Sequence, residues 1–330
     1  MSLSNFPDGL TSFGQLVGGI GVMGNVYYVV NTSDTASYNL AMERFGDVVY
    51  TDGTPMLHTT IASAYAATTT NRNDVIMIDS VSAHTLAEGL AITKSRIHFV
   101  GMDGGNRLEQ QGSRIVTTVD AADAYAIKNT GTRNTFENLK VCQSDTNAAA
   151  LHVWEEGGEG TMFKNCSFIF EVADNLDQTN CYEFVNGCDS GTFLNCTFGS
   201  DVLDTSVARA VMVADVVTSG QEFKDNQFHN CVFKIGSDDA DALHFLVLAT
   251  TDVKFGNLFK DCTFMNSINA TMGSVQLTVA VASVSSLVEG NIMFVNPATN
   301  AASFATTSDN FIVMGPIGAN TTTGVGITPA

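Results

Sequence analysis

The sequence predicts an all-β solenoid in which coils of about 27–35 residues stack on one another. The first observation is a repeated phrase, Phe-x-Asn/Asp-Cys-x-Phe, at 163–168, 193–198, 228–233 and 259–264, with weaker copies at 136–141 and 289–294. The second is its spacing, because the steps between equivalent positions are 27, 30, 35, 31 and 30 residues. The third is the alternation of apolar and polar side chains, which is typical of a strand.

A second apolar segment in each repeat predicts a second strand per coil. These segments lie at 151–154, 181–185, 210–213, 243–248 and 275–279. If each repeat is one coil, like strands stack in parallel about 4.8 Å apart. The repeated Cys then forms a column that faces the core, and the two Phe fill the core beside it. The Asn before the Cys lies at a bend, where stacked amide side chains can hydrogen-bond to each other.

This pattern resembles the right-handed parallel β-helix of the pectate-lyase-like group over roughly residues 70 to 315. The resemblance implies a single-stranded right-handed parallel β-helix, and it indicates little about chemistry because one fold serves many functions. Leucine-rich repeats fit less well, since they are usually 20–29 residues long. Helical repeats would require a 3.6-residue periodicity, which these segments lack.

The chain divides into four predicted parts: an N-terminal arm at 1–25, an N-terminal cap at 26–73, the β-helix at 74–315 and an extended C-terminal tail at 316–330. The cap is predicted to contain a strand at 25–30, a loop at 31–56 and a short amphipathic helix within 59–70. This helix would cover the open apolar end of the solenoid. The first coils are predicted from short strands at 74–79, 90–92, 96–100, 114–117 and 124–127.

The N-terminal arm has isolated aromatic residues and no periodicity, so it cannot form a core of its own. Two interpretations stay open: a loose terminus, or an anchor whose Phe6 and Phe13 enter pockets of another protein. The opening Asn-Phe-Pro-x-Gly-x-x-Ser-Phe-Gly resembles the starts of phage head-associated proteins. That resemblance implies a capsid anchor formed by Asn5, Phe6, Pro7 and Phe13.

Charge excludes several partners. The chain has 34 Asp plus Glu against 15 Lys plus Arg, a net charge of −19, so direct binding to nucleic acid or to an anionic membrane is not expected. No apolar run is long enough to span a bilayer, and no signal peptide is recognised at the N-terminus. The chain has seven Cys and no Cys-x-x-Cys motif. The cysteines are expected to pack as small buried side chains, and neither zinc binding nor disulfide bonds are expected.

Acidic turns are the strongest candidates for catalysis. Glu155, Glu156 and Glu159 form one group, and residues 238, 239 and 241 form another, both of which suit solvated loops. A glycosidase would pair two carboxylates, for instance Glu156 with Asp189 or Asp215. The six His are scattered through the chain, and most are expected to be structural. We therefore expect no catalytic residue, no cofactor, no metal and no enzymatic activity.

These observations favour a structural virion protein of a tailed phage. The hypothesis is a trimeric head decoration or cement protein that binds the outside of the major capsid protein lattice through its flexible ends and stabilises the shell by mass action. The alternative is a tailspike or tail fibre that binds or cleaves host surface polysaccharide. A free-standing polysaccharide lyase is a further alternative, which the scarcity of basic residues disfavours.

Overall fold

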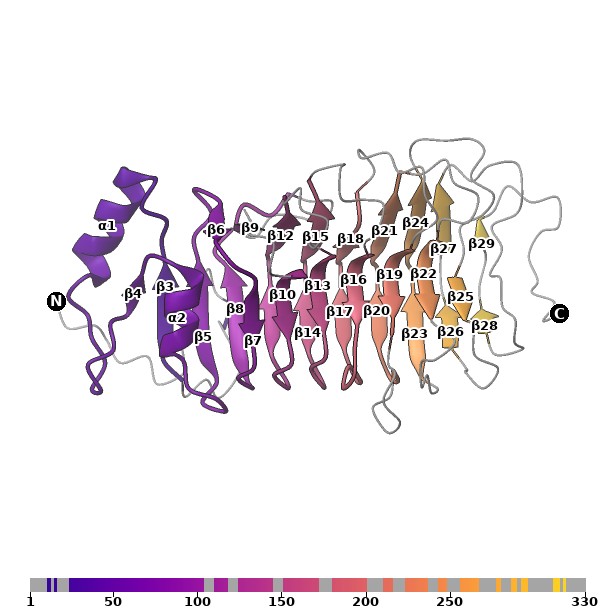
Figure 1. Cartoon of the computed structure of the whole chain (residues 1–330), viewed down its shortest axis with the longest axis horizontal. Coiled ribbons are helices and arrows are strands. Elements are labelled where there is room, and N and C mark those ends of the chain that lie inside the picture. The colour runs from indigo at the N-terminus through magenta and orange to yellow at the C-terminus, as the bar shows by residue number, and fades with distance from the viewer. Residues whose placement is uncertain are drawn as a thin grey trace.

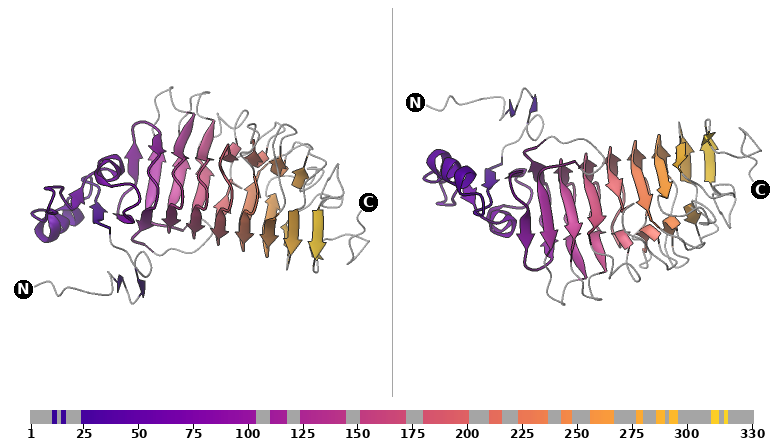
Figure 2. Two further views of the ribbon diagram at one scale, coloured as in Figure 1. Left: turned by 90° about the horizontal axis from the view of Figure 1, so that it is seen from below. Right: turned by 90° about the horizontal axis from the view of Figure 1, so that it is seen from above.

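The chain forms a parallel β-helix with a helical cap at its N-terminal end, as seen in a computed structural model (Figure 1). The structure describes residues 11–12, 15–16, 24–103, 110–117, 124–144, 151–171, 180–200, 210–215, 223–236, 243–247, 256–266, 277–279, 286–289, 292–295, 311–314 and 317–318. The coils follow one another along the long axis of the molecule (Figure 2). The predicted fold class is confirmed.

Three parallel sheets of eleven, nine and seven described strands run along the solenoid, and a coil that has all three strands contributes one to each sheet. The longest sheet has eleven strands: β4 (Leu57–His58), β3 (Val26–Val29), β5 (Asp74–Ile78), β8 (Ile97–Gly101), β11 (Thr135–Glu137), β14 (Met162–Lys164), β17 (Thr192–Leu194), β20 (Gln227–His229), β23 (Asn257–Lys260), β26 (Ser286–Glu289) and β28 (Phe311–Met314).

The second sheet has nine strands: β6 (His84–Leu86), β9 (Arg114–Thr117), β12 (Lys140–Gln143), β15 (Ser167–Phe170), β18 (Thr197–Phe198), β21 (Val232–Ile235), β24 (Thr263–Asn266), β27 (Ile292–Val295) and β29 (Ile317–Gly318). The third has seven: β7 (Leu90–Ile92), β10 (Tyr125–Asn129), β13 (His152–Glu156), β16 (Asn180–Phe184), β19 (Ala210–Ala214), β22 (Leu243–Val247) and β25 (Leu277–Val279). A separate pair joins β1 (Thr11–Ser12) to β2 (Gln15–Leu16).

The repeated phrase contributes two strands per coil, whereas the sequence predicted one. In the coil of Cys166, β14 ends at Lys164 and β15 begins at Ser167, so the two strands belong to different sheets. The chain turns between them because Asn165 has a left-handed backbone, with φ of 54°. Asn adopts this conformation more readily than most residues, since its short side chain hydrogen-bonds locally. The predicted bend is therefore sharp enough to divide the phrase.

These Asn residues also form the predicted ladder. Nδ2 of Asn165 donates to Oδ1 of Asn138 at 2.8 Å, and Nδ2 of Asn230 donates to Oδ1 of Asn195 at 2.6 Å. The φ angles of the equivalent positions in five successive coils lie between 54° and 59°. Four of these positions are Asn and the fifth is Asp261, and the Asn side chains supply both the bend and a contact between coils.

The interior consists of stacked columns of identical side chains. Four Cys of the phrase are at most 1% exposed: Cys166, Cys196, Cys231 and Cys262. Next to them, a column of Phe rings stacks in near-parallel pairs, with centroid distances of 4.9 Å between Phe163 and Phe193 and 4.6 Å between Phe193 and Phe228. All seven cysteines are buried, which confirms the prediction that they pack as small side chains. Parallel stacking in register therefore fills the core without a disulfide.

Two helices lie at the N-terminal end (Figure 1). The predicted helix is present as α2 (Ile61–Ala67), with Thr60 as its N-cap, and it buries Ile61, Ala64 and Tyr65 against the first coils. The prediction of a loop over 31–56 is wrong in part, because this segment contains α1 (Thr35–Phe45). Asp34 caps α1 by accepting a hydrogen bond from the backbone N–H of Ala36 at 3.2 Å.

Candidate functional site

The predicted anchor residues Asn5, Phe6, Pro7 and Phe13 lie outside the residues that the structure describes. The acidic group at 238, 239 and 241 also lies outside them. The proposed anchor therefore stays a prediction.

The first acidic turn does not bring its carboxylates together. The Glu155 side chain forms an ion pair with Lys128 on the neighbouring strand. Glu159 is exposed in the turn. Glu156 is 2% exposed and faces the core, so it cannot pair with Asp189 or Asp215 across a surface groove. The prediction of a surface-accessible Glu156 is wrong because alternate residues of β13 point to opposite faces of the sheet.

Glu156 is the centre of a buried polar network. Its Oε1 accepts hydrogen bonds from Asn129 Nδ2 at 2.7 Å, from Gly158 N at 2.8 Å and from Thr161 Oγ1 at 3.0 Å. Its Oε2 accepts from Trp154 Nε1 at 2.9 Å. Burial raises the pKa of this carboxyl to about 7, and the four donors oppose that rise. This carboxylate holds a turn inside the solenoid.

A second set of titratable groups brings together residues from the third sheet. His152 Nε2 lies 2.6 Å from Glu183 Oε2. Burial and, secondarily, the charge of Glu183 raise the pKa of Asp215, which follows β19. Nδ1 of His152 and Oδ1 of Asp215 are buried and have no hydrogen-bond partner among the residues that the structure describes. We name His152, Glu183 and Asp215 the carboxylate–histidine set.

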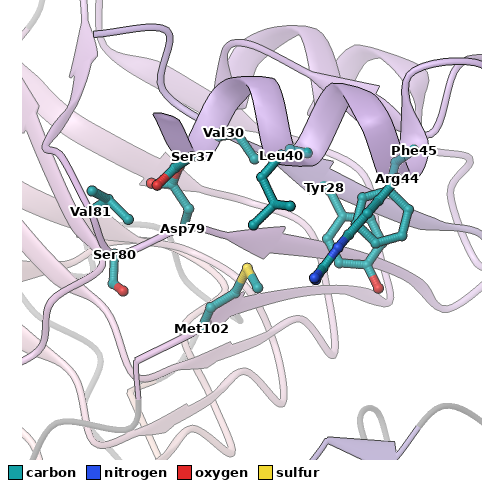
Figure 3. A pocket seen from close by; sticks show the side chains of 11 residues that line it. Tyr28, Val30, Ser37, Leu40, Arg44, Phe45, Asp79, Ser80, Val81 and Met102 are labelled. Carbon is teal, nitrogen blue, oxygen red and sulfur yellow. The ribbon is translucent and has the colours of Figure 1, made fainter. Parts of the chain in front are cut away.

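The hollow that Figure 3 shows lies between α1 and the first coils of the β-helix, and we name it the cap groove. It has a volume of about 210 Å³. Its lining residues are Tyr28, Val30, Ser37, Leu40, Ala41, Arg44, Phe45, Asp79, Ser80, Val81 and Met102. Helix α1 is held over β3 by Phe45, whose ring stacks on Tyr28 with 4.5 Å between the centroids.

Three large apolar side chains that line the cap groove are about half exposed to solvent. Leu40 is 47% exposed, Val81 56% and Met102 48%. The side chains of Leu40 and Met102 point toward one another across the groove (Figure 3). The grouping of three exposed apolar side chains around one hollow makes the cap groove a candidate interaction site.

The two charged residues of the cap groove differ in their partners. Asp79 accepts a hydrogen bond from Asn31 N at 3.0 Å, and its other oxygen lies 2.9 Å from His84 Nε2. Arg44 is exposed, and its side chain has no hydrogen bond or ion pair with any described residue. The groove thus offers apolar walls and one cation at the rim.

The cap groove could not be predicted without α1, which the sequence reasoning took for part of a loop. A signal was present: Asp34 is a favourable N-cap, and Tyr38, Ala41 and Phe45 recur at helical spacing. The exposed positions Val81 and Met102 could not be recognised from sequence, because they follow β5 and β8 on successive coils and meet α1 only in the folded molecule.

Within the described ranges, no group of three or more His, Cys, Asp or Glu side chains is placed to hold a metal ion. Neither α1 nor α2 in the described part of the chain has the length and apolar character that crossing a bilayer requires.

The chain matches no protein-family model and no curated protein. Among solved structures, it is similar to a pectin methylesterase in complex with a hexasaccharide, with a TM-score of 0.46, 12% identity, and coverage of 88% of this chain and 81% of the other. It is also similar to pectin methylesterase PemA from Erwinia chrysanthemi, with a TM-score of 0.43, 14% identity, and coverage of 89% and 81%. A third similar structure is ORF18 of Geobacillus virus E2, with a TM-score of 0.36, 13% identity, and coverage of 86% and 62%.

These comparisons correct one expectation. No enzymatic activity was expected from the sequence, but the solved structures to which this chain is similar include pectin methylesterases, which are enzymes. At 12–16% identity the likeness concerns the fold and does not assign an activity to this chain.

Proposed function

We propose that this chain is a structural protein of a tailed-bacteriophage virion, which decorates the outside of the head and stabilises the major capsid protein lattice. It acts as a homotrimer, and its N-terminal arm is the anchor. A β-helix fold fits a virion protein. The decoration role is the specific part of the proposal.

The observation that supports the proposal most is the uninterrupted stacking of the coils. One sheet runs through eleven strands from the cap to β28, and the Phe and Cys columns pass from coil to coil without a gap in the described core. Close-packed interiors have low compressibility. A rod of this kind resists deformation, which suits a protein that is exposed to mechanical load on a shell.

Two further features are compatible with the outside of a head. The net charge of −19 keeps particles apart and discourages binding to DNA. A subunit that binds the assembled lattice and not its free subunits stabilises the lattice by mass action. The arm residues Phe6 and Phe13 supply the apolar anchors that such binding needs.

The test is co-sedimentation of the purified protein with expanded heads that lack it. We expect saturable binding of the full chain and at least about a tenfold loss of affinity when Phe6 and Phe13 are both replaced by Ala, since buried aromatic anchors carry much of the binding energy. Replacing Thr11 and Ser12 by Ala is the matched control in the same arm. Absence of binding by the full chain would overturn the decoration role, whereas unchanged binding by the aromatic double variant would overturn only the anchor.

A second function is favoured by the carboxylate–histidine set: binding or cleavage of host surface polysaccharide, as by a tailspike. The set holds a His–carboxylate pair beside a second carboxyl with a raised pKa, and two of its buried polar atoms have no hydrogen-bond partner in the described part of the chain. Such groups are suited to acid–base chemistry and to hydrogen bonds with hydroxyls.

The measurement is the release of reducing ends from envelope polysaccharide of the host. If this second function holds, Glu183→Gln and Asp215→Asn each lower the rate by at least about 100-fold, as expected for loss of a general acid or base. The exposed Glu159→Gln variant is the control and retains the rate. Release that does not respond to the first two substitutions would exclude this set as the site.

A further inference from the structure

The cap groove leaves apolar side chains from three segments of the chain open to solvent, and the described chain runs into β3 from Gly24, four residues before Tyr28 of the groove wall. Leu40 belongs to α1, Val81 follows β5 and Met102 follows β8. We propose that the cap groove holds the segment Phe6–Gly9 of the same chain. The Phe6 ring lies between Leu40 and Met102, and the Asp8 carboxylate pairs with Arg44.

The size of the groove favours a side chain over a small-molecule ligand. Pockets for drug-sized ligands usually measure about 300–1,000 Å³, whereas this one measures about 210 Å³. The apolar walls require an apolar group, and Phe6 is the first aromatic residue of the chain. One aromatic ring covers the exposed surfaces of Leu40 and Met102 together.

The charges are complementary. Arg44 has no partner among the described residues, although the chain has more than twice as many acidic as basic side chains. Asp8 is the one charged side chain among residues 1–25. A carboxylate two positions after an aromatic ring matches a groove that has apolar walls and a cation at its rim.

The local sequence favours a compact tip. Phe6-Pro7-Asp8-Gly9 is a turn sequence, because Pro presets φ at the second position of a turn and Gly and Asp suit the positions after it. A turn places the Phe6 ring and the Asp8 carboxylate at one end of a reversed chain. The segment therefore presents both groups to one small site.

The length of the connecting segment permits docking in the same molecule. The continuous described chain resumes at Gly24, and Tyr28 of β3 lines the groove, which places the groove about 13 Å from Gly24 at a rise of about 3.3 Å per residue. The fifteen residues from Gly9 to residue 23 have an expected end-to-end distance of roughly 20 Å. A tether that matches the span gives an effective concentration in the millimolar range, which favours the same chain over a second copy.

Docking has one consequence that rests on the proposed function. If the arm is the capsid anchor, Phe6 is held by the cap groove in the free protein and must leave it to bind a head. The exposed apolar surface is then covered in solution, and the groove and the capsid compete for the same residue.

The experiment is a disulfide trap in the otherwise intact protein. Ser4→Cys is combined with Ser37→Cys or with Ser80→Cys, which replace small polar residues that line the groove from α1 and from the segment after β5. The control combines Ser4→Cys with Ser63→Cys, an exposed position of α2 that does not line the groove. The native cysteines are all buried and leave the pair as the reactive thiols. We expect at least one groove pair to close within the monomer about tenfold faster than the control.

Charge variants then test the pairing. Arg44→Asp and Asp8→Arg should each slow the trap by up to about fivefold, and the two together should restore it, since an exposed ion pair contributes at most about this factor. Equal rates in all three cysteine pairs, or no restoration by the charge swap, would overturn the proposal. Disulfide-linked dimers would overturn the assignment to the same chain. The trap contains no capsid, so its failure is distinct from failure of the decoration role.

Discussion

Replacing Phe193 with Ala is expected to lower the free energy of unfolding by about 3–5 kcal/mol. The Phe193 side chain is completely buried, and its ring lies between Phe163 and Phe228 in the stacked column. The rings of Tyr182 and Phe184 each contact the Phe193 ring edge-to-face. Ala removes the ring from the middle of the column and leaves a cavity that neighbouring coils, held in register by their strands, cannot close.

The measurement is urea unfolding followed by two probes, since coincident transitions are needed before a single free energy has meaning for a repeat architecture. The matched control is Phe193→Leu, which keeps most of the apolar volume and should cost under about 1.5 kcal/mol. A loss below about 1 kcal/mol for the Ala variant would contradict the columnar core.

The stability of the protein is expected to fall by about 3 kcal/mol between pH 4.5 and pH 7 because of Glu156. Burial raises the pKa of this carboxyl from about 4.5 to about 7 in the folded state. Below pH 4.5 the folded and unfolded states both carry the proton. Between the two pKa values only the folded state binds it, so each pH unit lowers the free energy of unfolding by about 1.4 kcal/mol. Above pH 7 this contribution is lost and the dependence ends.

The check is to compare the wild-type protein with Glu156→Gln by urea unfolding at pH 5 and pH 8. Gln cannot ionise. The difference in the free energy of unfolding between the two proteins should therefore change by about 3 kcal/mol over this range, and the higher pH should favour the Gln variant. Glu155→Gln is the matched control, because this neighbour lies on the outer face of the same strand in an ion pair with Lys128. The effect of Glu155→Gln on the free energy of unfolding should differ by under about 1 kcal/mol between the two pH values. An equal pH dependence in the wild-type and Glu156→Gln proteins would remove Glu156 as the cause.

The absolute effect of Glu156→Gln has a separate origin. Four donors point at the carboxylate, from Asn129, Trp154, Gly158 and Thr161. The amide NH₂ of Gln would face at least one of them, which leaves a buried donor unsatisfied at a cost of about 1–3 kcal/mol. The pH-dependent difference isolates ionisation from this constant cost.

The repeated phrase was sufficient to predict stacked coils, the inward Cys and the Asn bend, because each depends on local alternation and on repetition. It was not sufficient to show that the phrase divides into β14 and β15 in different sheets. That division depends on how far the backbone turns at Asn165, and a period-2 pattern of side chains looks the same on both sides of the turn.

The two candidate sites show the same limit. The acidic turn at Glu155 and Glu156 was recognised as a group, but strand parity places one carboxylate outside and the other inside the solenoid. His152, Glu183 and Asp215 lie on successive coils, 31 and 32 residues apart, and no local pattern relates them. Insertions of different length between coils set that separation.

By itself, the sequence determined the class of the molecule: its repeating phrase imposes a solenoid, its composition sets a strongly negative charge, and its cysteines are packed and not bonded. Only the tertiary structure decided which side chains meet. The cap groove exists because α1 lies over β3, and because Val81 and Met102 leave successive coils at the same edge. Stacking in register converts positions that are far apart along the chain into neighbours, and the register follows from the packing of the whole column and not from any one repeat.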